Sequence, residues 1–173
     1  MYSTDNEILE IVDAEDRVIG TATRSEIHRK GLLHRAVHLF VFDRAGRIYV
    51  QRRSDSKDRD PGKLDSSAAG HVEPGETYEE AAVRELQEEL GIHADVEELL
   101  RVPASEQTDH EHVVLFKVVT ELEPAPNPEE IQWGQFMSGD RLNKLMNEFP
   151  DDFVPGFIPL WRSFVQHQDQ GTV

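Results

Sequence analysis

The segment GHVEPGETYEEAAVRELQEELGI, residues 70–92, constrains the fold of this chain more than any other segment. Thr77 is followed three residues later by Glu80, which is the capping-box pattern and predicts a helix beginning near Tyr78. Gly91 supplies the left-handed residue that commonly ends a helix. The segment therefore predicts one helix whose two ends are both fixed by the local sequence.

The residues of this helix divide into an apolar face and an acidic face at about 3.6 residues per turn. The apolar positions expected on one face are Ala82, Val83, Leu86 and Leu90. Glu85, Glu88 and Glu89 fall on the adjoining face, where spacings of three and four bring like charges together. A divalent cation would turn this repulsion into coordination, and carboxylate oxygens suit Mg²⁺ or Mn²⁺. The other interpretation is a solvated face with Glu80–Arg84 and Arg84–Glu88 pairs.

The spacing within this segment resembles the signature box of the Nudix hydrolases at every fixed position. The matching positions are Gly70, Glu76 and the run Arg84-Glu85-Leu86-Gln87-Glu88-Glu89-Leu90-Gly91-Ile92. The resemblance implies that Glu85, Glu88 and Glu89 bind one or more Mg²⁺ or Mn²⁺ ions, with the backbone carbonyl of Ala69 as a further ligand. It also implies structural roles for Gly70 and for a Glu76–Arg84 pair that supports the helix.

The reaction implied by the resemblance is attack of water on one phosphorus of a diphosphate linkage. The catalytic residues would be Glu85, Glu88 and Glu89. A carboxylate must accept the proton of the water, and the candidates are Glu85, Glu89 or an acid of the loop 106–111, with Glu85 ranked first. The fold implied is an α/β/α sandwich with a mixed β-sheet.

Length and charge agree with one enzyme-sized domain, residues 1–173. A chain of 173 residues can bury roughly 70% of its unfolded surface. The 18 basic and 34 acidic residues give a net charge of −16, which argues against nucleic acid or an anionic membrane as partner.

There is no cysteine, so disulfides, zinc–thiolate sites and thiol nucleophiles are excluded. The first ten residues lack the features of a signal peptide, and no run is long and apolar enough for a membrane span, so we expect a cytoplasmic protein. The sequence gives no argument for an oligomeric state.

Patterns of apolar residues and turn residues predict strands that alternate with helices, which is typical of an α/β fold. The predicted strands are residues 8–12, 18–23, 34–42, 47–53, 64–69, 93–102, 112–120 and 131–136. The predicted helices are residues 25–30, 78–90, 140–148 and 158–166. The turn 43–46 predicts that the strands on either side of it pair with each other.

Residues 10–92 also resemble the isopentenyl-diphosphate isomerase branch of the Nudix superfamily and its isomerase-like hydrolases. In the isomerases an additional metal is held by histidines and acidic residues. The positions of this chain that match are His28, His34, His71, Asp109 and Glu111. The isomerase also needs a cysteine immediately before the Gly-His pair, where this chain has Ala69. Because the thiol is missing and the box glutamates are all kept, hydrolysis is favoured over isomerisation.

A basic cluster precedes the box, on the expected strand and loop that lead to it. Its members are Arg52, Arg53, Lys57, Arg59 and Lys63. One interpretation is a charge-balanced loop beside nearby aspartates. The other is a diphosphate clamp, for which Arg53 and Lys57 are the best candidates because matching positions in the isomerase branch contact the diphosphate.

The expected substrate is a nucleoside diphosphate derivative, above all a nucleoside 5′-di- or triphosphate that yields the monophosphate. Nucleotide sugars, dinucleotides and coenzyme A stay open, as do an isomerase-like enzyme and a nucleotide-binding sensor without activity. Aromatic residues that could stack on a base, although most should belong to the core or its rim, are Tyr78, Phe116, Trp133, Phe136, Phe153 and Trp161.

Overall fold

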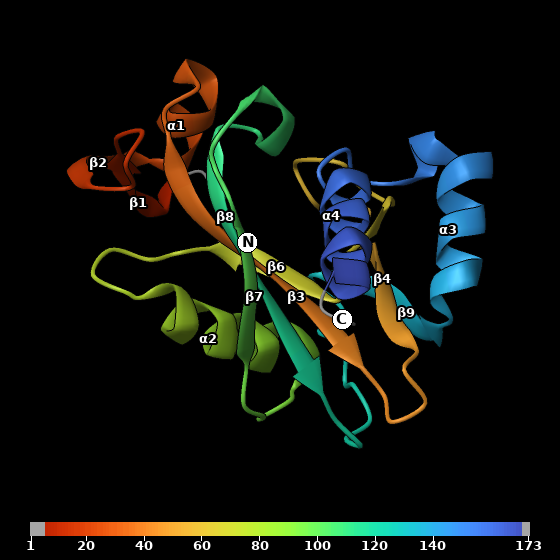
Figure 1. The fold of residues 1–173 in the computed structure, drawn as a ribbon. Helices are drawn as coiled ribbons and strands as arrows, with labels where there is room; N and C mark the ends of the chain where they lie inside the picture. Colours follow the sequence, from red (N-terminus) through yellow and green to blue (C-terminus); the bar gives the residue numbers. More distant parts are fainter. Residues whose placement is uncertain (1–5, 171–173) are drawn as a thin grey trace.

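A computed structural model describes residues 6–170 of the chain, in which strands alternate with helices (Figure 1). The strands are β1 (Ile8–Val12), β2 (Val18–Thr23), β3 (His34–Phe42), β4 (Ile48–Arg53), β5 (Leu64–Asp65), β6 (Ala68–His71), β7 (Glu97–Val102), β8 (Glu111–Val119) and β9 (Ile131–Met137). The α-helices are α1 (Arg24–Lys30), α2 (Tyr78–Leu90), α3 (Gly139–Glu148) and α4 (Phe157–Gln170). Two short 3₁₀ helices are η2 (Glu106–Thr108) and η3 (Pro150–Asp152).

The main sheet is mixed, as predicted. It has seven strands in the order β5-β4-β3-β8-β7, with β6 paired to β3 and β9 paired to β4. The central pair, β3 and β8, is parallel over its whole length, whereas the other pairs are antiparallel. The hairpin β1-β2 forms a separate two-stranded sheet.

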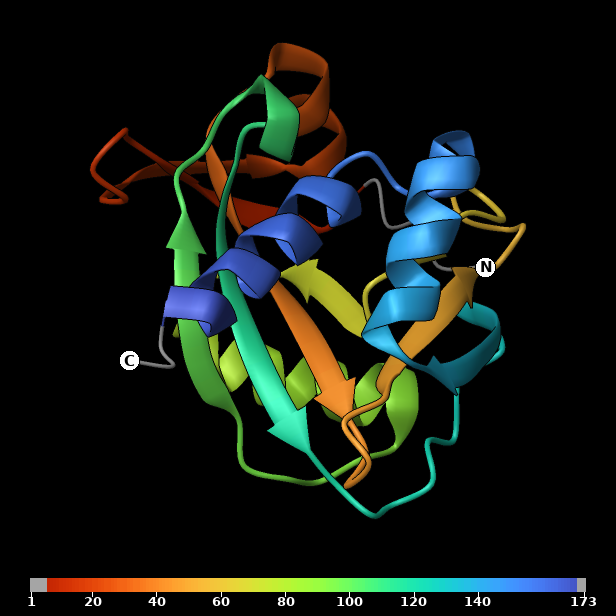
Figure 2. The ribbon, with the colours of Figure 1, turned by 45° about the vertical axis from the view of Figure 1, so that its right-hand side comes forward.

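Helices cover both faces of the main sheet. Figures 1 and 2 show α2 on one face and α4 on the other, with α3 beside α4. Alternate residues of β3 divide between two hydrophobic clusters, because successive side chains of a strand point to opposite faces. Val37 and Leu39 pack in the cluster with Leu86 of α2. Phe40 packs with Trp161 of α4 in the cluster on the opposite face.

Helix α2 forms as its sequence predicts, with one correction to its apolar face. Thr77 and Glu80 make both hydrogen bonds of the capping box, and Gly91 ends the helix in the left-handed conformation. Val83, which was expected on the buried face, is exposed, whereas Ala81 is fully buried. The prediction for Val83 was wrong because the contact stripe against the sheet follows residues 82, 86 and 90, and Val83 lies beyond its edge.

The strand before the box differs from the prediction of one continuous strand over residues 64–69. Two strands form instead: β5 pairs with β4, and β6 pairs with β3. Ser66 and Ser67 are fully buried where the chain crosses from one partner to the other. The hydroxyl of Ser67 donates to the carbonyl of Tyr49 at 2.6 Å and accepts from the amide of Val41 at 2.8 Å. The buried hydroxyl of Ser67 replaces ladder hydrogen bonds that the crossing interrupts.

Two further expectations are corrected. The strands on either side of the turn 43–46 pair only at Phe42–Ile48, because β6 takes the edge of β3 and β4 pairs mainly with β9. The strand expected at residues 93–102 begins at Glu97.

Within residues 6–170, no helix combines the length and hydropathy needed to cross a lipid bilayer.

Candidate active site

Strand β6 and helix α2 place the carboxylate of Glu85 directly against the backbone of Gly70. A side chain at residue 70 would have its Cβ 1.9 Å from Oε1 of Glu85. Glycine is therefore required at this position if the carboxylate is to keep its place. The Ala69 carbonyl belongs to the same strand, one residue earlier.

The box carboxylates differ strongly in burial. Glu89 is 6% exposed and the side chain of Glu85 is 12% exposed, whereas that of Glu88 is 59% exposed. Burial raises the pKa of Glu85 to about 7; Arg84 opposes this shift, and the charges of Glu88 and Glu130 add to it. Burial, followed by the charge of Glu85, raises the pKa of Glu89 well above its usual value. Buried carboxylates that repel one another fit a divalent cation with oxygen ligands.

Arg84 connects the box loop, strand β6 and helix α2. Its Nε and Nη2 donate to the two carboxylate oxygens of Glu76 at 2.9 and 3.0 Å. Nη2 also donates to the carbonyl of His71 at 2.9 Å, and Nη1 donates to Oε1 of Glu85 at 2.7 Å. The guanidinium fork thus fixes the loop and one box carboxylate at the same time.

Sequence reasoning missed two polar residues that lie near the box carboxylates, one on β4 and one directly before β9. Gln51 of β4 donates from Nε2 to Oε2 of Glu89 at 2.8 Å. Glu130, which directly precedes β9, pairs with Lys57 and raises the pKa values of both Glu85 and Glu89. The only signal in the sequence is the acidic pair Glu129-Glu130 before a predicted strand, which by itself does not indicate a site.

Four members of the basic cluster are paired with carboxylates. Arg53 contacts Asp65 at 3.1 Å, Lys63 contacts Asp60 at 3.0 Å, Lys57 pairs with Glu130, and Arg59 pairs with Asp109. Among the described residues Arg52 has no carboxylate partner, and its Nε is buried without a hydrogen bond. The charge-balanced interpretation therefore holds for these four residues, and the diphosphate contacts of Arg53 and Lys57 stay a prediction.

The three histidines predicted to hold an additional metal come together from α1, β3 and β6. His28, His34 and His71 each offer a ring nitrogen, and these atoms lie within 4.8 Å of one another. Nδ1 of His34 lies 2.9 Å from the carbonyl of Leu32, so Nδ1 is a donor, and Nε2 has a lone pair when the ring is neutral. The Nε2 atoms of His28 and His34 are buried and have no hydrogen-bond partner.

The two acidic residues predicted with these histidines lie beside them. Oε1 of Glu111 is 3.5 Å from Nε2 of both His34 and His71. Burial alone would raise the pKa of Glu111, but interactions with the two histidines hold it well below its usual value. Asp109 lies 3.1 Å from Nδ1 of His28. Unpartnered ring nitrogens beside an ionised carboxylate fit a divalent metal ion.

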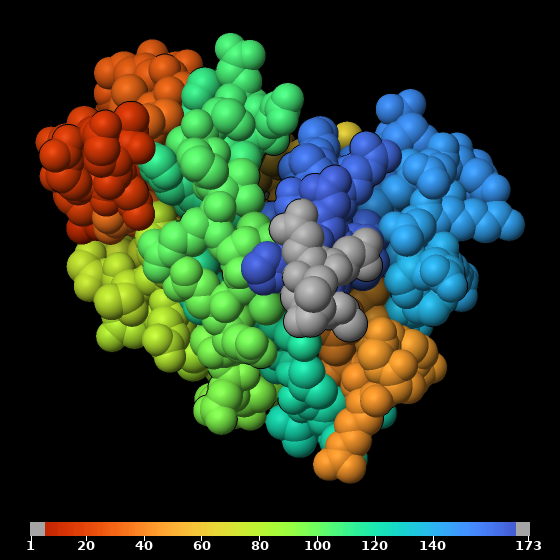
Figure 3. Space-filling view, viewed as in Figure 1, coloured from red at the N-terminus to blue at the C-terminus, as the bar shows by residue number. Residues whose placement is uncertain are grey.

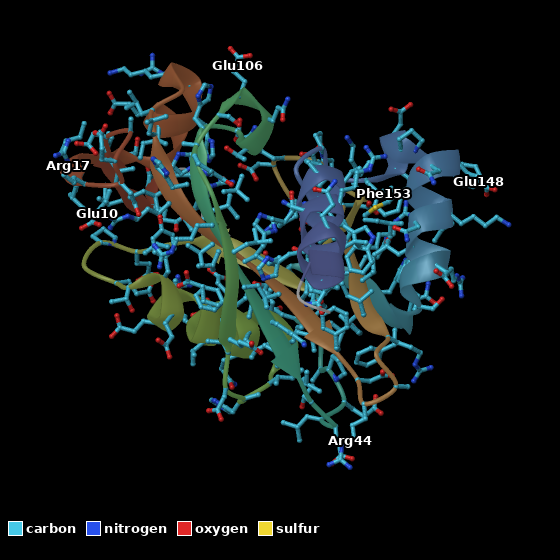
Figure 4. All side chains as sticks on the ribbon, in the orientation of Figure 1. Glu10, Arg17, Arg44, Glu106, Glu148 and Phe153 are labelled. Carbon is cyan, nitrogen blue, oxygen red and sulfur yellow. The ribbon has the colours of Figure 1, made fainter. Side chains whose placement is uncertain are left out.

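Within the loop 106–111, Asp109 and Glu111 lie beside the histidine cluster, and proton acceptance by an acid of this loop stays a prediction. Glu106 is exposed and points away from the molecule at the outer end of η2 (Figure 4).

Among the aromatic candidates for stacking, Phe116, Phe153 and Trp161 are buried in the core, and Figure 4 shows Phe153 between α4 and α3. Trp133 is 38% exposed and is the Cα partner of Arg52 in the β4–β9 pair.

Comparison with known proteins gives the family of this chain. A family model described as NUDIX domain matches residues 32–157. An uncharacterised Nudix hydrolase of Yersinia pestis is 36% identical over 96% of this chain and 92% of its own length. An isopentenyl-diphosphate Delta-isomerase of Serratia proteamaculans is 32% identical over 91% of this chain and 90% of its own length. A crystal structure from Deinococcus radiodurans superposes with a TM-score of 0.74 at 29% identity, covering 83% of this chain and 90% of the other. The chain belongs to the NUDIX family.

Proposed function

We propose that this protein is a divalent-metal-dependent hydrolase of diphosphate linkages that acts on nucleoside 5′-di- and triphosphates and yields the monophosphate. The observation that carries the proposal is the pair of buried carboxylates, Glu85 and Glu89, held beside Glu88 on α2. Their repulsion is relieved by a cation, and the phosphates of a substrate complete the coordination of such a cation.

In the proposed reaction a water oxygen attacks one phosphorus, the P–O bond to the bridging oxygen breaks, and the second phosphate leaves. Glu85, Glu88, Glu89 and the Ala69 carbonyl would hold Mg²⁺ or Mn²⁺, which when bound neutralises phosphate charge and lowers the pKa of bound water. We assign acceptance of the water proton to Glu85, whose carboxylate Arg84 orients through a 2.7 Å hydrogen bond. Arg53 and Lys57 would contact the diphosphate.

A nucleotide is supported by Trp133 and Arg52, which are partners across β4 and β9. An exposed indole can stack on a base, and a guanidinium group without a carboxylate partner can bind a phosphate. Nucleotide sugars, dinucleotides and coenzyme A carry the same diphosphate linkage and belong in the same assay.

The experiment is a panel of these compounds assayed with Mg²⁺ or Mn²⁺, with identification of the products. Glu88→Gln and Glu89→Gln should each lower kcat by several orders of magnitude while the far-UV spectrum and Tm stay close to wild type. Glu79→Gln, on the exposed side of the same helix, is the matched control and should keep wild-type activity. Near-wild-type turnover by Glu88→Gln and Glu89→Gln would sink the proposal, and nucleotide binding without phosphate release under any divalent metal would favour a sensor.

A second candidate, isomerisation of an isopentenyl diphosphate, is favoured by the name of the relative from Serratia proteamaculans. Against it stands Ala69, which has no proton-transfer group in the position where the isomerase resemblance requires a cysteine. Incubation with isopentenyl diphosphate should give no allylic product. Rearrangement at a rate above that of nucleotide hydrolysis would replace the proposed function with this one.

We also propose that the histidine cluster binds a second divalent metal ion. The support is the pair of buried, unpartnered Nε2 atoms of His28 and His34, together with the nearby Nε2 of His71. Glu111 would add a carboxylate oxygen. Nδ1 of His28 lies 2.7 Å from Nη1 of Arg59 and 3.1 Å from Asp109, and these two residues would orient the ring. Such outer hydrogen bonds fix the ring orientation of metal-binding histidines.

A further inference from the structure

His38 lies in the middle of β3, on the face of the main sheet that is turned away from α2. The residues two positions before and after it, Ala36 and Phe40, both pack in the cluster beneath α4. His38 is the direct Cα partner of Ala69 in the antiparallel β3–β6 pair. Directly paired residues of antiparallel strands project their side chains on the same face. The His38 ring therefore stands beside residue 69, whose carbonyl we assign to the metal.

The hydrogen bonds around His38 favour a proton on Nδ1 of its neutral ring. Nδ1 lies 2.9 Å from Oγ of Ser66, and this hydroxyl donates its single proton to the carbonyl of Ala68 at 3.3 Å. With the hydroxyl proton directed to Ala68, we assign Nδ1–H of His38 as the donor to Oγ. Nε2 of the neutral ring then keeps its lone pair. His38 consequently presents a hydrogen-bond acceptor at its outer nitrogen.

Ser66 is held in place beside the His38 ring by burial and by a backbone hydrogen bond. It is fully buried, and its amide donates to Oδ1 of Asp65 at 2.7 Å. Asp65 is itself buried and accepts from Arg53 at 3.1 Å. These contacts fix the backbone of Ser66, which keeps its hydroxyl beside Nδ1 of His38.

Nε2 of His38 is free to meet a ligand. The residue is half-buried; within the described part of the chain Nε2 has no hydrogen-bond partner, and it is not among the buried unpartnered nitrogens. His71 of the histidine cluster is its diagonal neighbour across β3 and β6, at a Cα separation of about 7–8 Å. Figure 3 shows the surface hollowed between the green atoms around η2 and the blue atoms of α4, on this side of the sheet.

We propose that Nε2 of His38 accepts a hydrogen bond from a hydroxyl or amine of the organic group attached to the substrate's diphosphate. His38 is then a specificity-determining residue that favours substrates whose organic group places a hydrogen-bond donor at Nε2. The inference rests on the proposed hydrolase function, because it uses the phosphate site at Ala69 to place the rest of the substrate on the His38 face.

Steady-state kinetics with matched nucleotides test the proposal and distinguish the two kinds of donor. Removal of a ribose hydroxyl is tested with ADP against its 2′-deoxy and 3′-deoxy forms. Removal of an amine is tested with ADP against IDP and with CDP against UDP. For one of these pairs, the kcat/KM of the wild-type enzyme should be about tenfold lower with the nucleotide that lacks the donor. This factor corresponds to the loss of one hydrogen bond. His38→Phe, which keeps a ring and removes the acceptor, should abolish that preference.

The matched control is His112→Phe on β8. His112 pairs with Arg35 in the β3–β8 register, on the opposite face, and its Nε2 donates to the carbonyl of Asp13 at 3.1 Å. It should keep the wild-type preference. A preference that survives in His38→Phe, or wild type without any preference, would overturn the inference and leave the hydrolase function intact. Absence of all nucleotide hydrolysis would instead overturn the proposed function, and this inference with it.

A measurement on unmodified protein covers the case in which His38→Phe fails to fold. The ¹⁵N shifts of the His38 ring should identify Nδ1–H and a bare Nε2, and the Nε2 resonance should move upfield when an α,β-methylene nucleoside diphosphate binds. Ser66→Ala should release the tautomer. A wild-type ring protonated at Nε2 in the neutral form, or an Nε2 resonance that the analogue leaves unchanged, would overturn the assignment.

Discussion

The carboxylate of Glu85 occupies the space in which any side chain at residue 70 would lie, so Gly70 and Glu85 fit together as a pair. The Cβ of an alanine at 70 would approach Oε1 of Glu85 to 1.9 Å and Cδ to 2.1 Å. The obstructing atoms are the end of a flexible side chain, so the helix can keep its place while the carboxylate moves away. The glycine of the box is thus a requirement of the site rather than of the turn.

Gly70→Ala should consequently lower metal affinity much more than stability. We expect Mg²⁺ or Mn²⁺ binding, measured by calorimetry, to weaken by at least tenfold and kcat to fall at least as far, because Glu85 is displaced. Gly156→Ala is the control: it has no neighbouring atom within 4 Å and no left-handed backbone conformation, so it should leave both quantities unchanged. Wild-type affinity in Gly70→Ala would refute the role given to this pair.

Arg84→Lys should destabilise the protein, because an ammonium group cannot contact Glu76, Glu85 and the His71 carbonyl together. We expect a loss of about 1–3 kcal/mol in the free energy of unfolding and a lower kcat from a displaced Glu85. Arg101→Lys tests the same substitution at an exposed fork on Glu98, with contacts of 2.7 and 2.8 Å. That control should change stability by no more than about 0.5 kcal/mol. Equal losses in urea denaturation of the two variants would contradict this account.

Metal stabilisation should increase with pH. The pKa of Glu85 is raised from 4.5 to about 7 in the metal-free protein, so between these values the folded state binds more protons than the unfolded state. Unfolding free energy of the metal-free protein therefore falls as pH rises through this window. Added Mg²⁺ needs the ionised carboxylate and should raise Tm more at pH 8 than at pH 5.5. A gain in Tm that is equal at the two pH values would rule out Glu85 as a ligand.

Glu130→Gln should shift the acidic limb of the pH–rate profile to lower pH. Removal of this carboxylate takes away one of the charges that raise the pKa values of Glu85 and Glu89. The neighbouring Glu129 is exposed, so Glu129→Gln is the control and should leave the profile in place. A profile that is the same in Glu130→Gln and wild type would show that Glu130 does not act on the carboxylates of α2.

The histidine cluster should retain metal separately from the carboxylates. After incubation with Mn²⁺ or Zn²⁺ and desalting, elemental analysis of wild type should find about one equivalent more than of His34→Asn. His93→Asn, at an exposed position, should retain the wild-type content. Equal metal content in His34→Asn and wild type would remove the second site from the proposal.

The sequence alone predicts those parts of the fold and site that depend on residues close along the chain. The boundaries of α2 follow from Thr77, Glu80 and Gly91, whose hydrogen bonds are local. The gathering of Glu85, Glu88 and Glu89 follows from helical geometry, because residues three and four apart share a face. The mixed α/β class follows from the alternation of the two periodicities.

Only the tertiary structure decides which distant segments meet at the site. The parallel pairing of β3 with β8 brings Glu111 to His34, and the antiparallel pairing of β3 with β6 brings His38 to Ala69. Glu130 lies near the carboxylates of α2, directly before β9, and no pattern in the neighbouring sequence predicts this position. These encounters depend on strand order and on the crossing at Ser66 and Ser67, which long-range packing selects. The local sequence determines which side chains each helix or strand carries on a given face. The strand order determines which of these side chains lie opposite one another.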